Sequence, residues 1–281
     1  MYAAGRLLAK KLGLTLHTEP LDGFPRTQDF IDGQAIDDNS QDMPLLERQG
    51  IPFQSNMCKL NGADPIPEWP DVSRLQGKHI EIEHGFVNSR YFMRDRDLIK
   101  SWLGGESLMQ PDPDAVLVNV RLKEFMPLGL ALHPYYYQKV LERLDFKKLY
   151  LMTDDPDNAY LDCFKKYSPE LITGSGPEHF FKAIGFNRII MSNSTFCWWF
   201  TFLSDAQEVF MPMLNGNRCG SWCTGQLPDI DLRLDLPGVT HVYNVPNTVP
   251  PNMCVSPTDT QIDELMSYGK YAHAYFLEPM P

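Results

Sequence analysis

Residues 112–212 alternate regularly between short apolar runs and segments whose apolar side chains repeat at the spacing of a helix face. The runs are too short to be helices and are predicted to be strands, at residues 116–120, 149–152, 171–172, 189–191 and 209–211. The helices between them are marked by Tyr137, Tyr160, Phe180 and Phe196. Such alternation with short connections predicts a parallel sheet covered by helices on both faces. The expected fold class is therefore α/β, with a Rossmann-type domain in this part of the chain.

The flanking parts of the chain have weaker periodicity. A helix is expected over the first twelve residues, strands at 14–16 and 79–82, and a helix at 91–103, whereas residues 19–71 are predicted to be rich in loops. After residue 212 the chain is rich in Pro, Gly and Asn, until Thr258 and Gln261 form a capping-box pattern that predicts a last helix. Three parts are thus predicted: an N-terminal half (1–111), the Rossmann-like half (112–212) and a C-terminal extension with a final helix (213–281).

The chain is acidic, with 36 Asp and Glu against 25 Lys and Arg, and a net charge of −11. This balance argues against nucleic acid or an anionic membrane as the main partner. It leaves room for a phosphate-bearing small molecule, because one arginine and a helix N-terminus can bind such a ligand in an acidic protein.

No apolar run approaches the length of a membrane span, and no signal peptide is recognisable, so the expected location is the cytoplasm. The six cysteines do not form a pair of pairs at zinc-ligand spacing, and the seven histidines are scattered. Cys163 and Cys197 fall inside helical patterns and are predicted to be buried free thiols. We therefore expect no metal and no cofactor.

A polar turn, Ser192, Asn193, Ser194 and Thr195, joins the strand expected at 189–191 to an aromatic helix. Its hydroxyls are suited to capping that helix. The N–H groups and positive dipole end of a helix start also attract anions such as a diphosphate. The alternative is an ordinary capped core helix, whose apolar face would consist of Phe196, Trp199, Phe200 and Leu203.

Polar residues also follow two other expected strands. Arg121 comes directly after the strand at 116–120, and Thr153, Asp154 and Asp155 follow the strand at 149–152. Parallel α/β sheets bind their ligands at the carboxyl ends of the strands. An arginine and a helix start would meet phosphate there, and a carboxylate can accept hydrogen bonds from a base or a ribose. The convergence predicts a nucleotide-diphosphate site, although Asp154 and Asp155 also fit a helix-entry cap before Pro156.

At these residues the chain resembles the α-1,2-fucosyltransferase-like family of inverting glycosyltransferases that use sugar nucleotides. The segment at 188–203, with its Ser-Asn-Ser-Thr-Phe-Cys-Trp-Trp core, is the closest match. The segment at 149–156 is similar to the family's strand ending in Ser/Thr-Asp-Asp-Pro, and that at 85–92 to its Gly-Tyr-Phe-Gln-Ser-x-x-Tyr-Phe. The opening helix looks like the one after the family's first glycine-rich loop, and that loop has no counterpart here. No useful match extends beyond residue 212.

The resemblance implies a GT-B-like fold, in which two Rossmann-like halves face a cleft. It implies a GDP-sugar, usually GDP-fucose, held by the second half, a glycan as acceptor, and transfer without a metal. Ser192, Ser194 and Thr195 would contact the diphosphate, and Asp154 or Asp155 the guanine or ribose. Arg121 would take the place of the family's phosphate-clamping arginine.

One motif departs from the family. Its His-x-Arg-Arg-Gly-Asp segment appears here as Asn-Val-Arg-Leu-Lys-Glu at 119–124, so that one arginine remains and Lys123 replaces the glycine. The candidate donor-binding residues are Asn119, Arg121, Asp154, Asp155, Ser192, Asn193, Ser194 and Thr195, and the candidate catalytic residues are Arg121 and Glu124.

Inverting transfer needs a base for the acceptor hydroxyl and stabilisation of the departing diphosphate. Arg121 and the helix start are assigned to the second task. Glu124, at the place of the family's Asp, is the candidate base or else a solvated carboxylate. The predicted function is therefore transfer of a sugar, by default fucose, from a nucleotide diphosphate to a glycan hydroxyl. The alternatives are another nucleotide-sugar donor, or a non-catalytic nucleotide- or glycan-binding relative.

Overall fold

The chain divides into two compact units, Met1–Gly105 and Glu106–Pro281. The computed structural model describes residues 2–13, 16, 21–30, 57–61, 79–83, 92–126, 130–213, 233–243 and 275–276, and of 29–30, 57–61, 79–83, 243 and 275–276 it describes the backbone alone. The helix predicted from Thr258 onward, the segment at 85–91 and three of the six cysteines lie outside these residues.

In the first unit the predicted opening helix is present as α1 (Tyr2–Leu12), with Leu7 and Leu8 fully buried. Strand β2 (His79–Glu83) confirms the strand expected at 79–82, and it pairs in parallel with β1 (Met57–Asn61). β1 was missed, because residues 19–71 were predicted to be loop-rich. Of the strand expected at 14–16 only Leu16 is described, and it is not in a strand.

The helix expected at 91–103 begins later than predicted. Met93–Asp95 form a short 3₁₀ turn, η4, and the α-helix α3 runs over Arg96–Leu103. The 3₁₀ helix η1 (Pro25–Phe30) lies against α3. Lys11 at the end of α1 forms an ion pair with Asp95, with 2.7 Å between Nζ and Oδ2. This pair ties the end of α1 to the turn that precedes α3.

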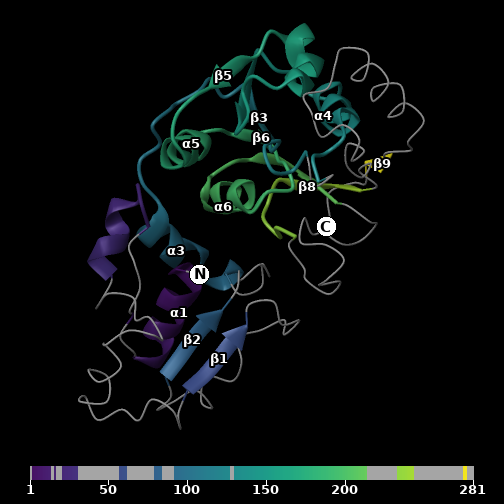
Figure 1. Ribbon diagram of the computed structural model, residues 1–281. Helices are drawn as coiled ribbons and strands as arrows, with labels where there is room; N and C mark the ends of the chain where they lie inside the picture. The colour runs from purple at the N-terminus through teal and green to yellow at the C-terminus, as the bar shows by residue number, and fades with distance from the viewer. Residues whose placement is uncertain are drawn as a thin grey trace. The chain divides into compact units, whose positions relative to one another are not determined.

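The second unit is built on one sheet (Figure 1). Six parallel strands are hydrogen-bonded in the order β5-β4-β3-β6-β7-β8, and a two-residue antiparallel strand, β9 (Tyr275–Phe276), follows β8. Numbered along the chain, the parallel strands have the order 3-2-1-4-5-6 of doubly wound Rossmann sheets. The expected Rossmann-like α/β fold is therefore confirmed. The strands are β3 (Ala115–Val120), β4 (Lys148–Thr153), β5 (Glu170–Ile172), β6 (Arg188–Ile190), β7 (Glu208–Pro212) and β8 (Val239–Tyr243).

Helices cover both faces of this sheet. α4 (Pro134–Leu141) lies on one face, and α5 (Gly176–Ala183) and α6 (Thr195–Leu203) lie on the other (Figure 1). The α4 face has a core in which Val116, Val118 and Val120 of β3 join Tyr137 of α4. Alternate residues of β3 point to opposite faces, so that Leu117 and Asn119 face the α5 and α6 side. The helix expected around Tyr160 is a 3₁₀ helix, η5 (Ala159–Tyr167), packed into the α4-side core.

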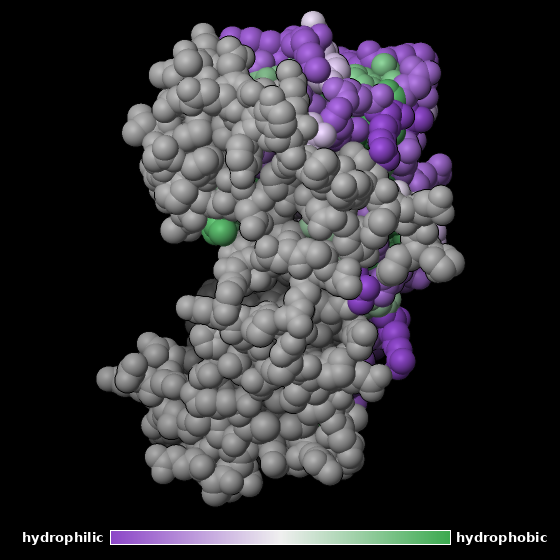
Figure 2. All heavy atoms as spheres, turned by 90° about the vertical axis from the view of Figure 1, so that its right-hand side faces the viewer, coloured by the Kyte–Doolittle hydropathy of each residue, from purple (hydrophilic) through white to green (hydrophobic). Residues whose placement is uncertain are grey.

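The sheet continues past residue 212, although the sequence pattern predicted its last strand at 209–211. β8 lies within 213–281 and pairs in parallel with β7. No helix of the described residues is long and apolar enough to cross a membrane. On the face shown in Figure 2, hydrophilic residues dominate the surface that is described, and apolar residues form only small patches. The large hydrophobic side chains exposed in the described part are Leu21, Leu108 and Leu171.

Gly238 makes the entry into β8 possible. Its φ of +81° lies in the left-handed region, and a Cβ at this position would lie 2.0 Å from the carbonyl oxygen of Gln207. Its own carbonyl oxygen accepts a hydrogen bond of 2.9 Å from the N–H of Val209 in β7. The start of β8 is thus held against the start of β7 by backbone atoms that leave no room for a side chain.

We therefore expect Gly238→Ala to lower the free energy of unfolding by about 1–3 kcal/mol, because alanine must adopt a strained backbone conformation and displace Gln207. Urea denaturation measures this change. Gly176→Ala is the matched control: it opens α5, and a Cβ there has nothing within 4 Å. It should leave stability unchanged or slightly higher. Equal stability of the two variants would contradict the assigned backbone constraint.

Candidate functional site

The candidate residues gather where the order of the sheet reverses. The chain builds β3, β4 and β5 outward in one direction and then returns to place β6 on the other side of β3. Doubly wound sheets bind ligands at this switch point, beyond the carboxyl ends of the two central strands. Asn119 and Arg121 lie at the end of β3, Asp154 follows β4, and Ser192 follows β6. The structure therefore places the predicted clusters at one edge of the sheet.

Two buried side chains join the strand ends at the switch point. The hydroxyl of Ser192 donates to Oδ1 of Asn119 over 2.5 Å. Nδ2 of Asn119 donates to the carbonyl oxygen of Met152 in β4, over 3.4 Å. Asn119 is 5% exposed and Ser192 is 2% exposed. Their polar atoms thus connect β6, β3 and β4 just below the carboxyl edge.

The turn from β6 to α6 is capped as expected. The side chain of Ser194, the N-cap residue, accepts a hydrogen bond of 3.2 Å from the N–H of Phe196. Asn193 is buried and donates to the carbonyl oxygen of Leu130 over 2.9 Å, which ties the turn to the loop after β3. Thr195 is the exposed member of the turn. Within the described part of the chain its N–H and hydroxyl have no hydrogen-bond partner, so both are available to a ligand.

Helix α6 differs from the one-faced helix expected from its sequence. It is buried on nearly all sides, because Trp198, Phe200 and Phe202 are covered as well as Leu203, whereas Trp199 stays half-buried. The ring of Trp198 stacks on that of Phe202 with 4.9 Å between centroids. A helix enclosed in this way is firmly placed, and its N-terminus therefore has a defined position at the sheet edge.

Cys197 lies in the first turn of α6 and, like Cys163, is a buried free thiol, as predicted. Burial raises the pKa of the Cys197 thiol to about 12, although hydrogen bonds from Ser192 act in the opposite direction. The thiol therefore stays protonated and unreactive at neutral pH. Cys197 belongs to the packing beneath the turn rather than to its chemistry.

Arg121 is enclosed by two carboxylates and a ring. Its guanidinium forms ion pairs with Glu124, which Nε and Nη2 both contact, and with Asp154, at 3.2 Å from Nε to Oδ2. The ring centroid of Phe125 lies 5.9 Å from the central carbon of the guanidinium. About a third of the arginine side chain is exposed, at 32%. Arg121 is thus a well-placed cation that already has anionic partners.

Asp154 holds the loop that follows β3. Its Oδ1 accepts from the N–H of Leu122 over 2.8 Å, and its Oδ2 accepts from the N–H of Lys123 over 3.2 Å. With the contact to Arg121, the carboxylate spans the ends of β3 and β4. These contacts satisfy the loop backbone and account for the position of Asp154 without a ligand.

Asp155 faces the next turn instead. Its Oδ2 accepts a hydrogen bond of 2.8 Å from Nδ2 of Asn158, the N-cap residue of η5. This arrangement fits the helix-entry cap considered from the sequence. The structure does not join Asp155 or Thr195 to the Arg121 cluster by any contact among the described residues.

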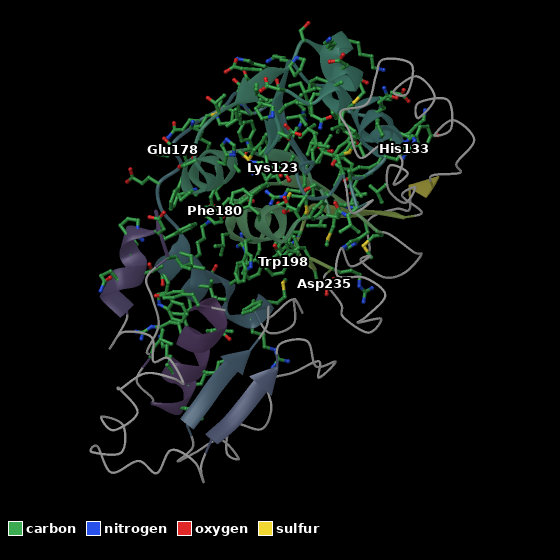
Figure 3. The ribbon with its side chains drawn as sticks, viewed as in Figure 1. Lys123, His133, Glu178, Phe180, Trp198 and Asp235 are labelled. Atoms are coloured by element: carbon green, nitrogen blue, oxygen red, sulfur yellow. The ribbon has the colours of Figure 1, made fainter. Side chains whose placement is uncertain are left out.

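The altered motif at 119–124 has a packing reason. Leu122 stands where the resembling family has its second arginine, and it is fully buried in the core on the α4 side. Lys123 is exposed at the end of the same loop (Figure 3). Burial alone would raise the pKa of Glu124, but hydrogen bonds from Arg121 and a backbone N–H, with the charges of Arg121 and Lys123, hold that pKa below its usual value. Glu124 is therefore ionised at neutral pH.

The sequence did not single out Tyr136, which secures the same edge from the other face. Its hydroxyl lies 3.0 Å from the carbonyl oxygen of Met191, directly after β6, and 2.9 Å from that of Phe210, in the middle of β7. It reaches them from α4, which lies on the face of the sheet opposite α5 (Figure 1). The triple tyrosine at 135–137 predicts the start of a helix. It does not predict which of the three rings points into the core, because this depends on the rotation of the helix about its axis.

No protein-family model matches this chain, and a comparison with curated proteins finds no match. Among the residues that the structure describes, no three His, Cys, Asp or Glu side chains are grouped so that they could hold a metal ion. What the site can do is therefore argued from its own groups. These are a placed arginine, an exposed lysine and a rigid helix start at a Rossmann switch point.

We expect Ser192→Ala to lower the free energy of unfolding by about 1–3 kcal/mol, because the buried Oδ1 of Asn119 would lose its donor. Urea or thermal unfolding measures the loss. Thr195→Ala is the matched control, since it removes a neighbouring hydroxyl that is exposed. A Ser192→Ala protein as stable as the Thr195→Ala protein would show that the tie between β3 and β6 contributes little.

Proposed function

We propose that this protein is an inverting glycosyltransferase that moves a sugar, in the first place fucose from GDP-fucose, to a hydroxyl group of a glycan. The observation that carries the proposal is the coincidence of Arg121 and the start of α6 at the switch point of a Rossmann sheet. The resemblance of the segments at 149–156 and 188–203 to the fucosyltransferase-like family supports the reaction class.

In this proposal the diphosphate of the donor lies over the carboxyl ends of β3 and β6. The free N–H and hydroxyl of Thr195, at the positive end of α6, would bind one phosphate. Arg121 would bind through its planar fork, and Lys123 would add a mobile positive charge. These groups would stabilise the negative charge that develops on the departing GDP, which is the main electrostatic demand of the reaction.

The proposal also includes the GT-B arrangement, with the donor in the second unit and the acceptor held by the first. The Rossmann order of the second unit and the parallel β1–β2 pair of the first are compatible with two such halves. The acceptor is placed in the first unit by the resemblance alone.

Glu124 is the candidate base for the acceptor hydroxyl. Its ion pair with Arg121 and its lowered pKa make it a weak base as it is placed. The role of Glu124 in proton transfer would therefore require that it leave Arg121 when the substrates bind.

A second candidate function has its own support. Leu122 fills the core where the resembling family has a second arginine, Asn119 stands in place of its histidine, and Arg121 is already paired. These features would suit a nucleotide- or glycan-binding relative that has lost catalysis. Such a protein would bind GDP without releasing fucose from GDP-fucose in the presence of glycan acceptors.

We expect GDP compounds to raise the melting temperature of the protein more than UDP or dTDP compounds do, and Arg121→Ala to remove most of this rise. The physical reason is loss of the guanidinium that this proposal places at the phosphates. A thermal-shift panel of GDP-, UDP- and dTDP-sugars measures the effect, and its strongest member identifies the donor base.

The matched control is Arg188→Ala. Arg188 lies at the opposite end of β6, where it pairs with Glu208 at 3.1 Å and donates to the carbonyl oxygen of Asp145. Its loss removes the same charge and an ion pair of the same kind, so any general loss of stability is shared. The nucleotide-induced rise should survive in Arg188→Ala. An equal rise in Arg121→Ala would exclude Arg121 from the phosphate site, and no rise with any nucleotide would refute the proposed function.

A further inference from the structure

We propose that Glu124 is a built-in competitor of the donor diphosphate: it occupies the edge of the Arg121 guanidinium that a phosphate needs, and diphosphate binding displaces it. Asp154 keeps the arginine in position during the exchange. This inference rests on the proposed function and concerns the same site. It gives Glu124 a role that precedes any proton transfer.

The two carboxylates on Arg121 are held very differently. Asp154 accepts hydrogen bonds from the backbone N–H groups of Leu122 and Lys123 in addition to its contact with Arg121, and its side chain is 15% exposed. Removing it from the arginine would leave two N–H groups of the loop without their acceptor. Asp154 is therefore the fixed partner of the pair.

Glu124 is the partner that can leave. Its side chain is 49% exposed, and Arg121 is the side chain to which it is hydrogen-bonded. An exposed ion pair of this kind contributes little to stability, because solvent screens both charges. Replacement of Glu124 by a ligand therefore costs little interaction energy, and the released carboxylate is readily solvated.

The local charges give the exchange its direction. Arg121 and Lys123 carry two positive charges, and Glu124 and Asp154 carry two negative charges, so the cluster is neutral overall. When Glu124 moves away, the three remaining groups carry a net charge of +1. A diphosphate carries more negative charge than a carboxylate and therefore interacts more strongly with this positively charged cluster. It can thus displace Glu124 from Arg121.

One nitrogen of the guanidinium is already open to the incoming ligand. Asp154 engages Nε, Glu124 engages Nε and Nη2, and no residue in the described part accepts from Nη1. Once Glu124 leaves, Nη1 and Nη2 form an end-on fork suited to two phosphate oxygens. The ring of Phe125 lies near the guanidinium, with its centroid 5.9 Å from the central carbon. The ligand class is thus a nucleoside diphosphate or another compact polyanion rather than a single carboxylate.

The test is the dissociation constant for GDP, measured by calorimetry with Glu124→Gln, Arg121→Ala and the double variant. Glu124→Gln should bind GDP roughly two- to five-fold more tightly than the unaltered protein, which corresponds to removal of an exposed ion pair. The gain should be absent when Arg121 is also replaced, because there is then no cation to release.

Glu142→Gln is the control for net charge. Glu142 forms an ion pair of the same spacing with Lys139 at the end of α4, so its loss changes the charge of the protein equally. It should leave GDP affinity unchanged. If it tightens binding as much as Glu124→Gln does, or if the gain persists without Arg121, the effect is general electrostatics and the competitor role is overturned.

The two proposals fail in distinguishable ways. If the unaltered protein binds GDP and Glu124→Gln binds it equally or more weakly, the competitor role is overturned and the proposed function stands. If neither protein binds GDP or a GDP-sugar, the proposed function fails and this inference fails with it.

Discussion

The buried hydrogen bond between Ser192 and Asn119 is the contact on which the site depends. It joins the ends of β6 and β3, the two strands between which the sheet changes direction. Because both side chains are almost fully buried, neither can lose its partner without a cost in stability. The tie fixes the turn that opens α6 relative to the loop that carries Arg121. Without that fixed relation, a helix start and an arginine would be two unrelated surface features.

Around this tie, the edge is held by groups that act on the backbone. Asp154 holds the loop after β3, and Asn193 holds the same loop from the β6 side. Tyr136 joins the end of β6 to the middle of β7 from the opposite face. Among the described residues of the site, the accessible groups are Thr195, Lys123, Glu124 and part of Arg121. Several residues expected to meet a ligand therefore serve first as supports, and the charge presented by the edge depends on whether Glu124 stays paired with Arg121.

Much of the sheet could be predicted because its strands are short apolar runs bounded by polar residues. Such runs can be recognised without knowing which distant residues they contact. β8 was missed because it lies in a stretch rich in Pro, Gly and Asn, and β1 because it lies in a stretch rich in Pro, Gly and Asp. Each becomes a strand through pairing with a distant neighbour. Helix α6 was expected to show one apolar face. Its burial on nearly all sides depends on what packs around it, which periodicity does not report.

The sequence by itself determined the α/β class, the positions of the polar clusters at strand ends and the cap of α6, because these follow from local patterns of burial and hydrogen bonding. Only the tertiary structure decided the strand order, and with it the switch point between β3 and β6. It also decided the partners of each polar group: Arg121 with Glu124 and Asp154, Asn119 with Ser192. Partner choice depends on which chain segments meet in space, and strand order joins residues more than 70 positions apart in the chain.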